Sequence, residues 1–114
     1  MKDQIIASLK ILTDALHIDA AKKGFWDDDQ HRYEDTATRL ALIHSEISEA
    51  LEGLRLGNPP DDKIPEFSAM EAELADAVIR IFDLCGGREY RLAEAIWAKM
   101  EFNRLREYKH GKEF

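Results

Sequence analysis

Apolar residues recur along the chain at helical spacing and divide it into four amphipathic segments. The first segment covers residues 3–22, where apolar residues three or four positions apart share one helix face: Ile5, Leu9, Leu12 and Leu16. A polar, aspartate-rich connection follows over residues 24–35. No segment alternates apolar and polar residues with the two-residue period of a strand. The pattern therefore predicts an all-α protein.

The second segment, residues 36–56, also carries an apolar stripe at helical spacing. Its members are Leu40, Ile43, Ile47, Ala50, Leu51 and Leu54. We expect this helix to stop at Gly57-Asn58-Pro59-Pro60, because proline lacks a backbone N–H and glycine favours the end of a helix.

The third helix has a clear start in the sequence. Ser68 followed three residues later by Glu71 fits a capping box, in which each side chain bonds the backbone of the other residue. The pair Gly86-Gly87 is expected to end this helix, and a fourth helix is expected over residues 88–108. The four segments together predict a four-helix bundle.

Length and composition restrict the class of protein. A chain of 114 residues suits a single domain, residues 1–114, with one core. Its net charge of −7 argues against binding to a nucleic acid polymer, and no apolar run approaches the roughly 18 residues of a membrane span. The N-terminus lacks the apolar core of a signal peptide, and the single Cys85 is expected to be a buried thiol. These features predict a cytoplasmic protein.

Two carboxylate pairs stand out, Glu46 with Glu49 and Glu73 with Asp76. A spacing of three residues places both members of a pair on one helix face, with Cβ atoms about 5–6 Å apart. If the two helices pack antiparallel and face to face, four carboxylates meet in one small volume, which requires a positive partner. Hard oxygen ligands favour Mg²⁺ or Mn²⁺. The pairs therefore predict a metal site and chemistry on phosphates.

The alternative is a lattice of salt bridges on the helix surface, where charged residues at this spacing usually lie. One geometrical observation favours the metal site. At about 100° per residue the acids border the apolar stripes instead of opposing them. Iron is disfavoured, because a di-iron bundle needs histidine where Glu49 and Asp76 stand.

Other side chains are suited to a nucleotide. Lys99, Asn103 and Arg106 recur at helical spacing on the fourth helix and predict a stripe that faces a polyphosphate. Arg80 continues the acidic stripe of the third helix. Trp26, in the loop, is suited to stacking on a nucleobase and equally to anchoring that loop on the core.

These residues resemble the MazG-type, all-α nucleoside triphosphate pyrophosphohydrolases. The resemblance covers residues 36–114. It rests on Glu46-x-x-Glu49, on Glu73-x-x-Asp76, and on the ending Lys99…Asn103-Arg104…Lys109-His110-Gly111-Lys112…Phe114. Phosphoribosyl-ATP pyrophosphohydrolases and dimeric dUTPases share the acid pattern, so the substrate is not fixed by it. Some dCTP-preferring relatives carry an aromatic residue where this chain has Leu56, so their base preference is not carried over.

The resemblance implies Mg²⁺-dependent hydrolysis of a nucleoside triphosphate, expected to be a deoxynucleotide, to the monophosphate and pyrophosphate. Water attacks the α-phosphorus, with Glu46 or Glu49 orienting or deprotonating it. The implied metal ligands are Glu46, Glu49, Glu73 and Asp76, with Mn²⁺ as an alternative ion. The expected substrate contacts are Trp26, Arg80, Lys99, Asn103, Lys109 and Lys112.

Two further expectations concern assembly and the alternative function. Ile79, Phe82, Trp97 and Phe102 are left over beyond the core stripes, which predicts self-association. The resemblance likewise implies a dimer or a dimer of dimers. The alternative to an enzyme is a noncatalytic helical module that binds nucleotides or protein partners and keeps the acids for structure.

Overall fold

The chain folds entirely into helices. A computed structural model describes all residues, 1–114, and contains four α-helices and one short 3₁₀ turn. The helices are α1 (Lys2–Lys22), α2 (Tyr33–Arg55), α3 (Ala69–Arg88) and α4 (Leu92–Arg104), and the 3₁₀ turn is η1 (Tyr108–Gly111). The all-α prediction is confirmed. No helix is both long enough and apolar enough to cross a membrane.

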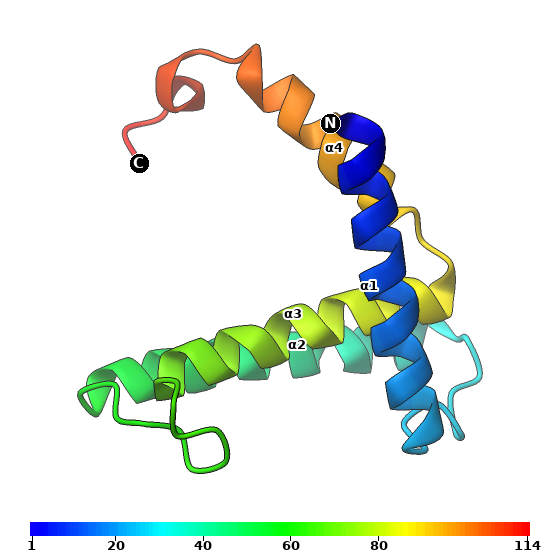
Figure 1. Ribbon diagram of the computed structural model, residues 1–114, viewed down its shortest axis with the longest axis vertical. Coiled ribbons are helices and arrows are strands. Elements are labelled where there is room, and N and C mark those ends of the chain that lie inside the picture. The colour runs from blue at the N-terminus through cyan, green and yellow to red at the C-terminus, as the bar shows by residue number, and fades with distance from the viewer.

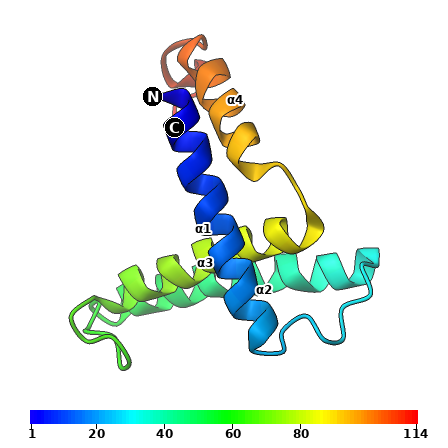
Figure 2. The ribbon, with the colours of Figure 1, turned by 45° about the vertical axis from the view of Figure 1, so that its right-hand side comes forward.

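Helices α2 and α3 form an antiparallel pair, and α1 crosses that pair (Figure 1). Helix α4 turns back from the end of α3 and packs along the N-terminal half of α1, as both views show (Figure 2). An ion pair of 3.3 Å between Lys10 Nζ and Glu94 Oε2 joins α4 to α1. The α2–α3 pair therefore forms the base of the molecule, and α4 lies away from it.

Capping boxes set the starts of α2 and α3. The Ser68 hydroxyl accepts a hydrogen bond of 3.2 Å from the backbone N–H of Glu71, whose carboxylate accepts one from the Ser68 backbone, so the predicted capping box is confirmed. Helix α2 begins three residues before the predicted position, at Tyr33. The cause is Asp35, whose carboxylate accepts from the backbone N–H of Arg32 at 3.2 Å.

The glycine pair does not end α3, so that prediction was wrong. The helix continues through Gly86 and Gly87 and ends beyond Arg88, at Glu89 in the left-handed conformation with φ of 59°. Both glycines permit close packing instead. A Cβ atom on Gly86 would lie 2.8 Å from Cβ of His17 on α1, and one on Gly87 would overlap the Trp26 ring.

The fourth helix is shorter than the predicted 88–108. Since α3 extends through Arg88, α4 begins only at Leu92, and it ends at Arg104. Beyond it, Lys109 and His110 have positive φ values of 55° and 54°, which a continuing α-helix cannot accommodate.

The core within one chain is small. Only ten residues are buried, and most of those that are apolar lie between α2, α3 and α1. Phe82 is one of them, so the expectation that it is left over for self-association was wrong. Cys85 is a buried free thiol, as predicted, and burial raises its pKa. Many large apolar residues remain exposed on α2 and α3.

Candidate functional site

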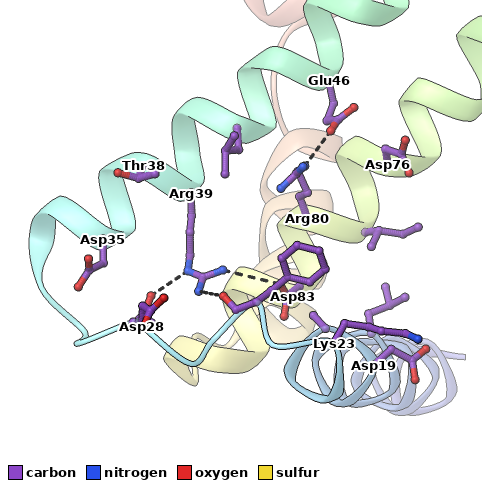
Figure 3. Close-up of a pocket in the computed structure, with 16 residues that line it drawn as sticks. Asp19, Lys23, Asp28, Asp35, Thr38, Arg39, Glu46, Asp76, Arg80 and Asp83 are labelled. Carbon is purple, nitrogen blue, oxygen red and sulfur yellow. Dashed lines mark hydrogen bonds and ion pairs between the residues drawn. The ribbon is translucent and has the colours of Figure 1, made fainter.

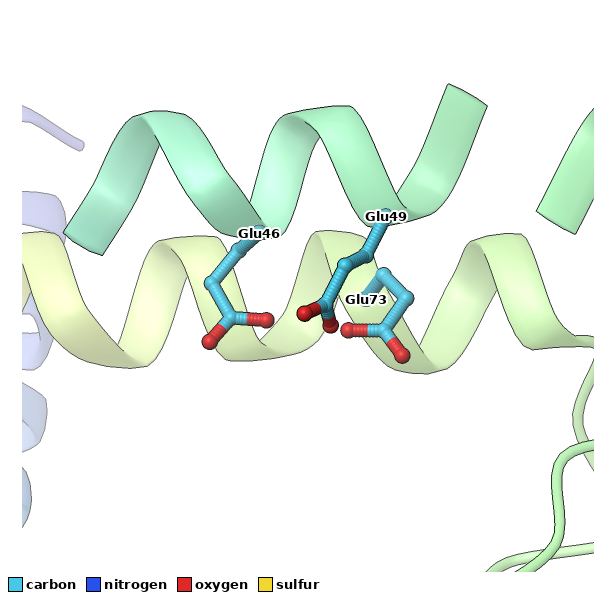
Figure 4. A group of neighbouring side chains, drawn as sticks. All are labelled: Glu46, Glu49 and Glu73. Carbon is cyan, nitrogen blue, oxygen red and sulfur yellow. The ribbon is translucent and has the colours of Figure 1, made fainter. Parts of the chain in front are cut away.

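The antiparallel α2–α3 pair brings three of the predicted acids together. Glu46 and Glu49 lie one turn apart on α2 and face Glu73 on α3 (Figure 4). One carboxylate oxygen of each lies within 4.8 Å of the others. Glu46 is buried, Glu73 is half-buried and Glu49 is exposed, so the group opens from the helix seam toward solvent. We call these three residues the glutamate cluster.

The electrostatics of the cluster favour a bound positive charge. Burial, and then the neighbouring Glu46 and Glu49, raise the pKa of Glu73 to about 7. The Oε2 atom of Glu73 is buried and has no hydrogen-bond partner. A buried acceptor without a donor costs free energy, which a proton or a cation can recover.

Asp76, the fourth predicted ligand, lies outside the cluster. It sits one turn after Glu73 on α3 and lines the pocket that adjoins the cluster. Desolvation, followed by the charge of Glu46, raises its pKa, and Arg80 opposes that shift. Of the four carboxylates that were expected to meet, the structure therefore brings three together and leaves Asp76 outside the group.

The donor set fits Mg²⁺ or Mn²⁺. All of its atoms are carboxylate oxygens, which hard divalent cations prefer, and no histidine or cysteine lies in the cluster. The exposed side of the cluster leaves room for water or phosphate oxygens, which Mg²⁺ usually retains among its ligands. The unpaired Glu73 oxygen is an acceptor that a bound cation would satisfy.

Arg80 lies where the cluster adjoins a neighbouring pocket. Its Nε donates a hydrogen bond of 2.8 Å to Oε1 of Glu46, and its side chain is partly exposed. Arg80, Glu46 and Asp76 all line the pocket (Figure 3), so the pocket adjoins the cluster at Glu46.

The pocket has a volume of about 610 Å³, large enough for a drug-sized ligand. It lies among α1, α2, α3 and the loop between α1 and α2. Its lining residues are Leu16, Asp19, Ala20, Lys23, Phe25, Asp28, Asp29, Asp35, Thr38, Arg39, Leu42, Glu46, Asp76, Ile79, Arg80 and Asp83.

A buried ion-pair network fixes the loop that walls this pocket. Arg88 donates two hydrogen bonds to the Asp29 carboxylate, at 2.8 and 2.9 Å, and Arg39 donates a third at 2.9 Å. The hydrogen bonds from Arg88, and then from Arg39, hold the pKa of Asp29 well below its usual range despite its burial. Sequence reasoning missed these residues, because charged residues so far apart in the chain show no local pattern.

Trp26 anchors the same loop. Its Nε1 donates to Oδ1 of Asp83 at 2.8 Å, and the guanidinium of Arg39 lies 3.5 Å from its ring centroid. The ring also packs against Gly87. Because these contacts occupy the indole, the structure favours the anchoring role over stacking on a nucleobase. Asp83 also binds His17 Nδ1 at 2.9 Å, a partnership that sequence reasoning missed.

The basic residues of the C-terminal region do not join the glutamate cluster within one chain. Lys99 lies on α4, which packs on α1. Asn103, Lys109 and Lys112 line a separate hollow near the C-terminus, and Oδ1 of Asn103 is buried without a partner. The predicted stripe facing the acids is therefore absent from the single chain.

Comparison with models of known protein families, with curated proteins and with solved structures gives no match to this chain. The case for a function therefore depends on the residues and their geometry.

The raised pKa of Glu73 predicts how stability depends on pH without metal. Between its ordinary pKa of 4.5 and about 7, the folded protein holds a proton that the unfolded chain has released. The free energy of unfolding in EDTA should therefore fall as pH rises through this window. Glu73→Gln should flatten this dependence in urea unfolding at several pH values. Glu52→Gln, on the exposed side of α2, should not, and equal slopes for all three proteins would contradict the assignment.

Proposed function

We propose that this protein is a Mg²⁺-dependent nucleoside triphosphate pyrophosphohydrolase, with Mn²⁺ as an alternative ion. The observation that carries the proposal is the glutamate cluster, with its unpaired Glu73 oxygen, at the edge of a nucleotide-sized pocket. The resemblance of the acid pairs and the C-terminal sequence to MazG-type enzymes supports it. The buried, unpaired Cys85 thiol suits a reducing compartment, so we propose the cytoplasm as its setting.

The reaction breaks the bond between the α-phosphorus and its bridging oxygen. A water oxygen attacks the α-phosphorus, pyrophosphate leaves with the bridging oxygen, and the proton of the water passes to a carboxylate. Bound Mg²⁺ supplies charge neutralisation on the phosphates and lowers the pKa of the attacking water. Glu46, Glu49 and Glu73 would hold the ion, with Asp76 at the edge of the site. Glu49 is the better proton acceptor, because it is exposed while Oε1 of Glu46 accepts from Arg80.

The adjoining pocket is proposed to receive the nucleoside. Apolar side chains from three elements line it beside its charged groups, among them Leu16, Leu42 and Ile79. Such a mixture suits a base and a sugar, which present flat apolar faces and polar edges. The ion pairs on Asp29 hold the loop wall in place, so the pocket exists before the substrate binds.

A second copy of the chain is proposed to complete the protein. The exposed surface of one chain is 8785 Å², whereas a monomer of this mass exposes about 6,400 Å². The difference, about 2,400 Å² for one subunit and about 4,800 Å² for a pair, lies within the range of about 2,000–5,000 Å² that obligate dimers bury in total. The radius of gyration, 16.4 Å, likewise exceeds the roughly 13 Å of a compact domain of this length.

The apolar residues that a second copy would cover lie mainly on the base of the molecule. The exposed residues on α2 repeat at intervals of seven, four and three, as in a helix-packing seam: Leu40, Ile47, Leu51 and Leu54. Leu74, Val78 and Ile81 continue this surface on α3. We propose that pairing of two copies also brings Lys99 and Asn103 of one copy to the cluster of the other.

The first test of this function is product analysis. With Mg²⁺ and the common ribo- and deoxyribonucleoside triphosphates, the protein should release pyrophosphate and a monophosphate, resolved by ion-exchange chromatography. Glu49→Gln should lower kcat by roughly a hundredfold or more, because it removes a metal ligand and the proposed proton acceptor. Glu52→Gln, one turn away on α2, should retain activity.

Two results would contradict the mechanism. Release of orthophosphate and a diphosphate would place the attack at the γ-phosphorus. Nucleotide binding without any turnover across the panel would favour the noncatalytic module instead.

Subunit mixing tests the shared site. Glu49→Gln and Lys99→Ala should each be nearly inactive as pure proteins, since each lacks one half of every site. After co-refolding, half of the dimers are mixed and each has one intact site, so activity should recover to about a quarter of wild type. If both residues act within one chain, mixing gives no recovery. Light scattering on the same samples should report a dimer or larger, and a stable monomer would exclude the shared site.

A further inference from the structure

Arg80 is paired with a residue of the proposed metal set. Its Nε lies 2.8 Å from Oε1 of Glu46, across the seam between α3 and α2. The side chain of Glu46 is 10% exposed and that of Arg80 is 40% exposed. The acid of this pair is therefore fixed inside the molecule, while the guanidinium lies at the edge of the pocket.

Because of this pairing, Arg80 competes with a metal ion for Glu46. A divalent cation in the glutamate cluster and the guanidinium both draw on the negative charge of Glu46. Arginine cannot relieve the conflict by losing its proton, since its pKa is too high. The conflict is removed only if the guanidinium moves away from Glu46 or if another anion joins it.

The side chain of Arg80 can move into the adjoining pocket. It lines the pocket together with Asp76, its side chain is long, and no other hydrogen bond holds it. The other arginine that lines this pocket, Arg39, differs, because it is held by Asp29 in the buried network. A planar guanidinium matches a phosphate group in shape and charge, so a polyphosphate in the pocket offers Arg80 a new partner.

We infer that Arg80 is an exchangeable counter-ion that makes the site take up metal and polyphosphate together. In the free protein it neutralises Glu46 and opposes binding of a metal ion alone. When metal and polyphosphate are both present, Glu46 turns to the metal and Arg80 turns to the phosphate. This inference rests on the proposed function and adds that metal and nucleotide bind with positive cooperativity carried by Arg80.

The test measures Mn²⁺ binding by electron paramagnetic resonance, with and without a nonhydrolysable nucleoside triphosphate analogue. Mn²⁺ held by the free analogue is measured separately and subtracted. Without analogue, Arg80→Gln should bind Mn²⁺ about tenfold more tightly than wild type, because the competing charge is gone. The tightening that the analogue produces should shrink by a similar factor. Arg55→Gln is the matched control, since Arg55 is an exposed arginine on α2 paired only with Glu52, and it should behave as wild type.

Arg80→Lys separates charge from shape. It keeps the positive charge, so Mn²⁺ alone should still bind weakly, but it loses the planar fork, so the analogue should tighten binding less than in wild type. Circular dichroism melts establish that each variant is folded. If Arg80→Gln does not fold, the lysine variant alone decides, and wild-type cooperativity in it would overturn the inference.

Different results would contradict the role of Arg80 and the proposed function. Equal or weaker Mn²⁺ binding by Arg80→Gln, with wild type binding the ion and hydrolysing nucleotide, overturns the role of Arg80 and leaves the proposed function in place. Arg80 would then be a positioning residue that holds Glu46 for the metal. Absence of Mn²⁺ binding and of hydrolysis in wild type overturns both.

Discussion

Repulsion among Glu46, Glu49 and Glu73 across the seam of α2 and α3 is the constraint on which the rest of the structure depends. Packing of small residues brings the two helices close enough to crowd these acids, as where Gly53 faces Ala69. Without metal, two features reduce the repulsion. Glu73, whose pKa is raised to about 7, can hold a proton, and Arg80 forms an ion pair with Glu46. Neither feature removes all of the repulsion, and in our proposal a divalent cation neutralises the three carboxylates.

Comparison of Asp29 with Glu73 shows that the lack of a positive partner is confined to the glutamate cluster. Asp29 receives hydrogen bonds from two arginines, and its charged form is strongly stabilised. Glu73, which is less deeply placed, receives none from a cation and keeps an orphaned oxygen. The chain can therefore satisfy a buried carboxylate, and does so where the carboxylate only fixes a loop. The unsatisfied Glu73 lies at the seam, beside Glu46 and the pocket that Glu46 lines, and perturbed groups beside pockets are candidates for a function.

Sequence patterns predicted the helices better than the contacts between them. The all-α class and the capping box at Ser68 follow from spacings within helices, which the sequence displays directly. The closeness of Glu46, Glu49 and Glu73 required in addition that two consecutive helices pack antiparallel, as they do. The path of α3 through Gly86 and Gly87 was mispredicted, because the cause is a contact with α1 and Trp26 far away in the chain. The position of α4, and with it Lys99, was missed for the same reason: a helix's apolar face does not reveal which neighbour covers it.

Thermal unfolding in EDTA and in excess Mg²⁺ tests the central claim most directly, with wild type beside Glu49→Gln and Asp76→Asn. If the acids repel one another and await a cation, wild type gains stability with Mg²⁺ by mass action. Each variant in EDTA then melts at the wild-type temperature or higher and gains much less from Mg²⁺. If the acids belong to a salt-bridge lattice, the variants melt lower in EDTA and Mg²⁺ leaves wild type unchanged. That second pattern would contradict the metal site and the function proposed from it.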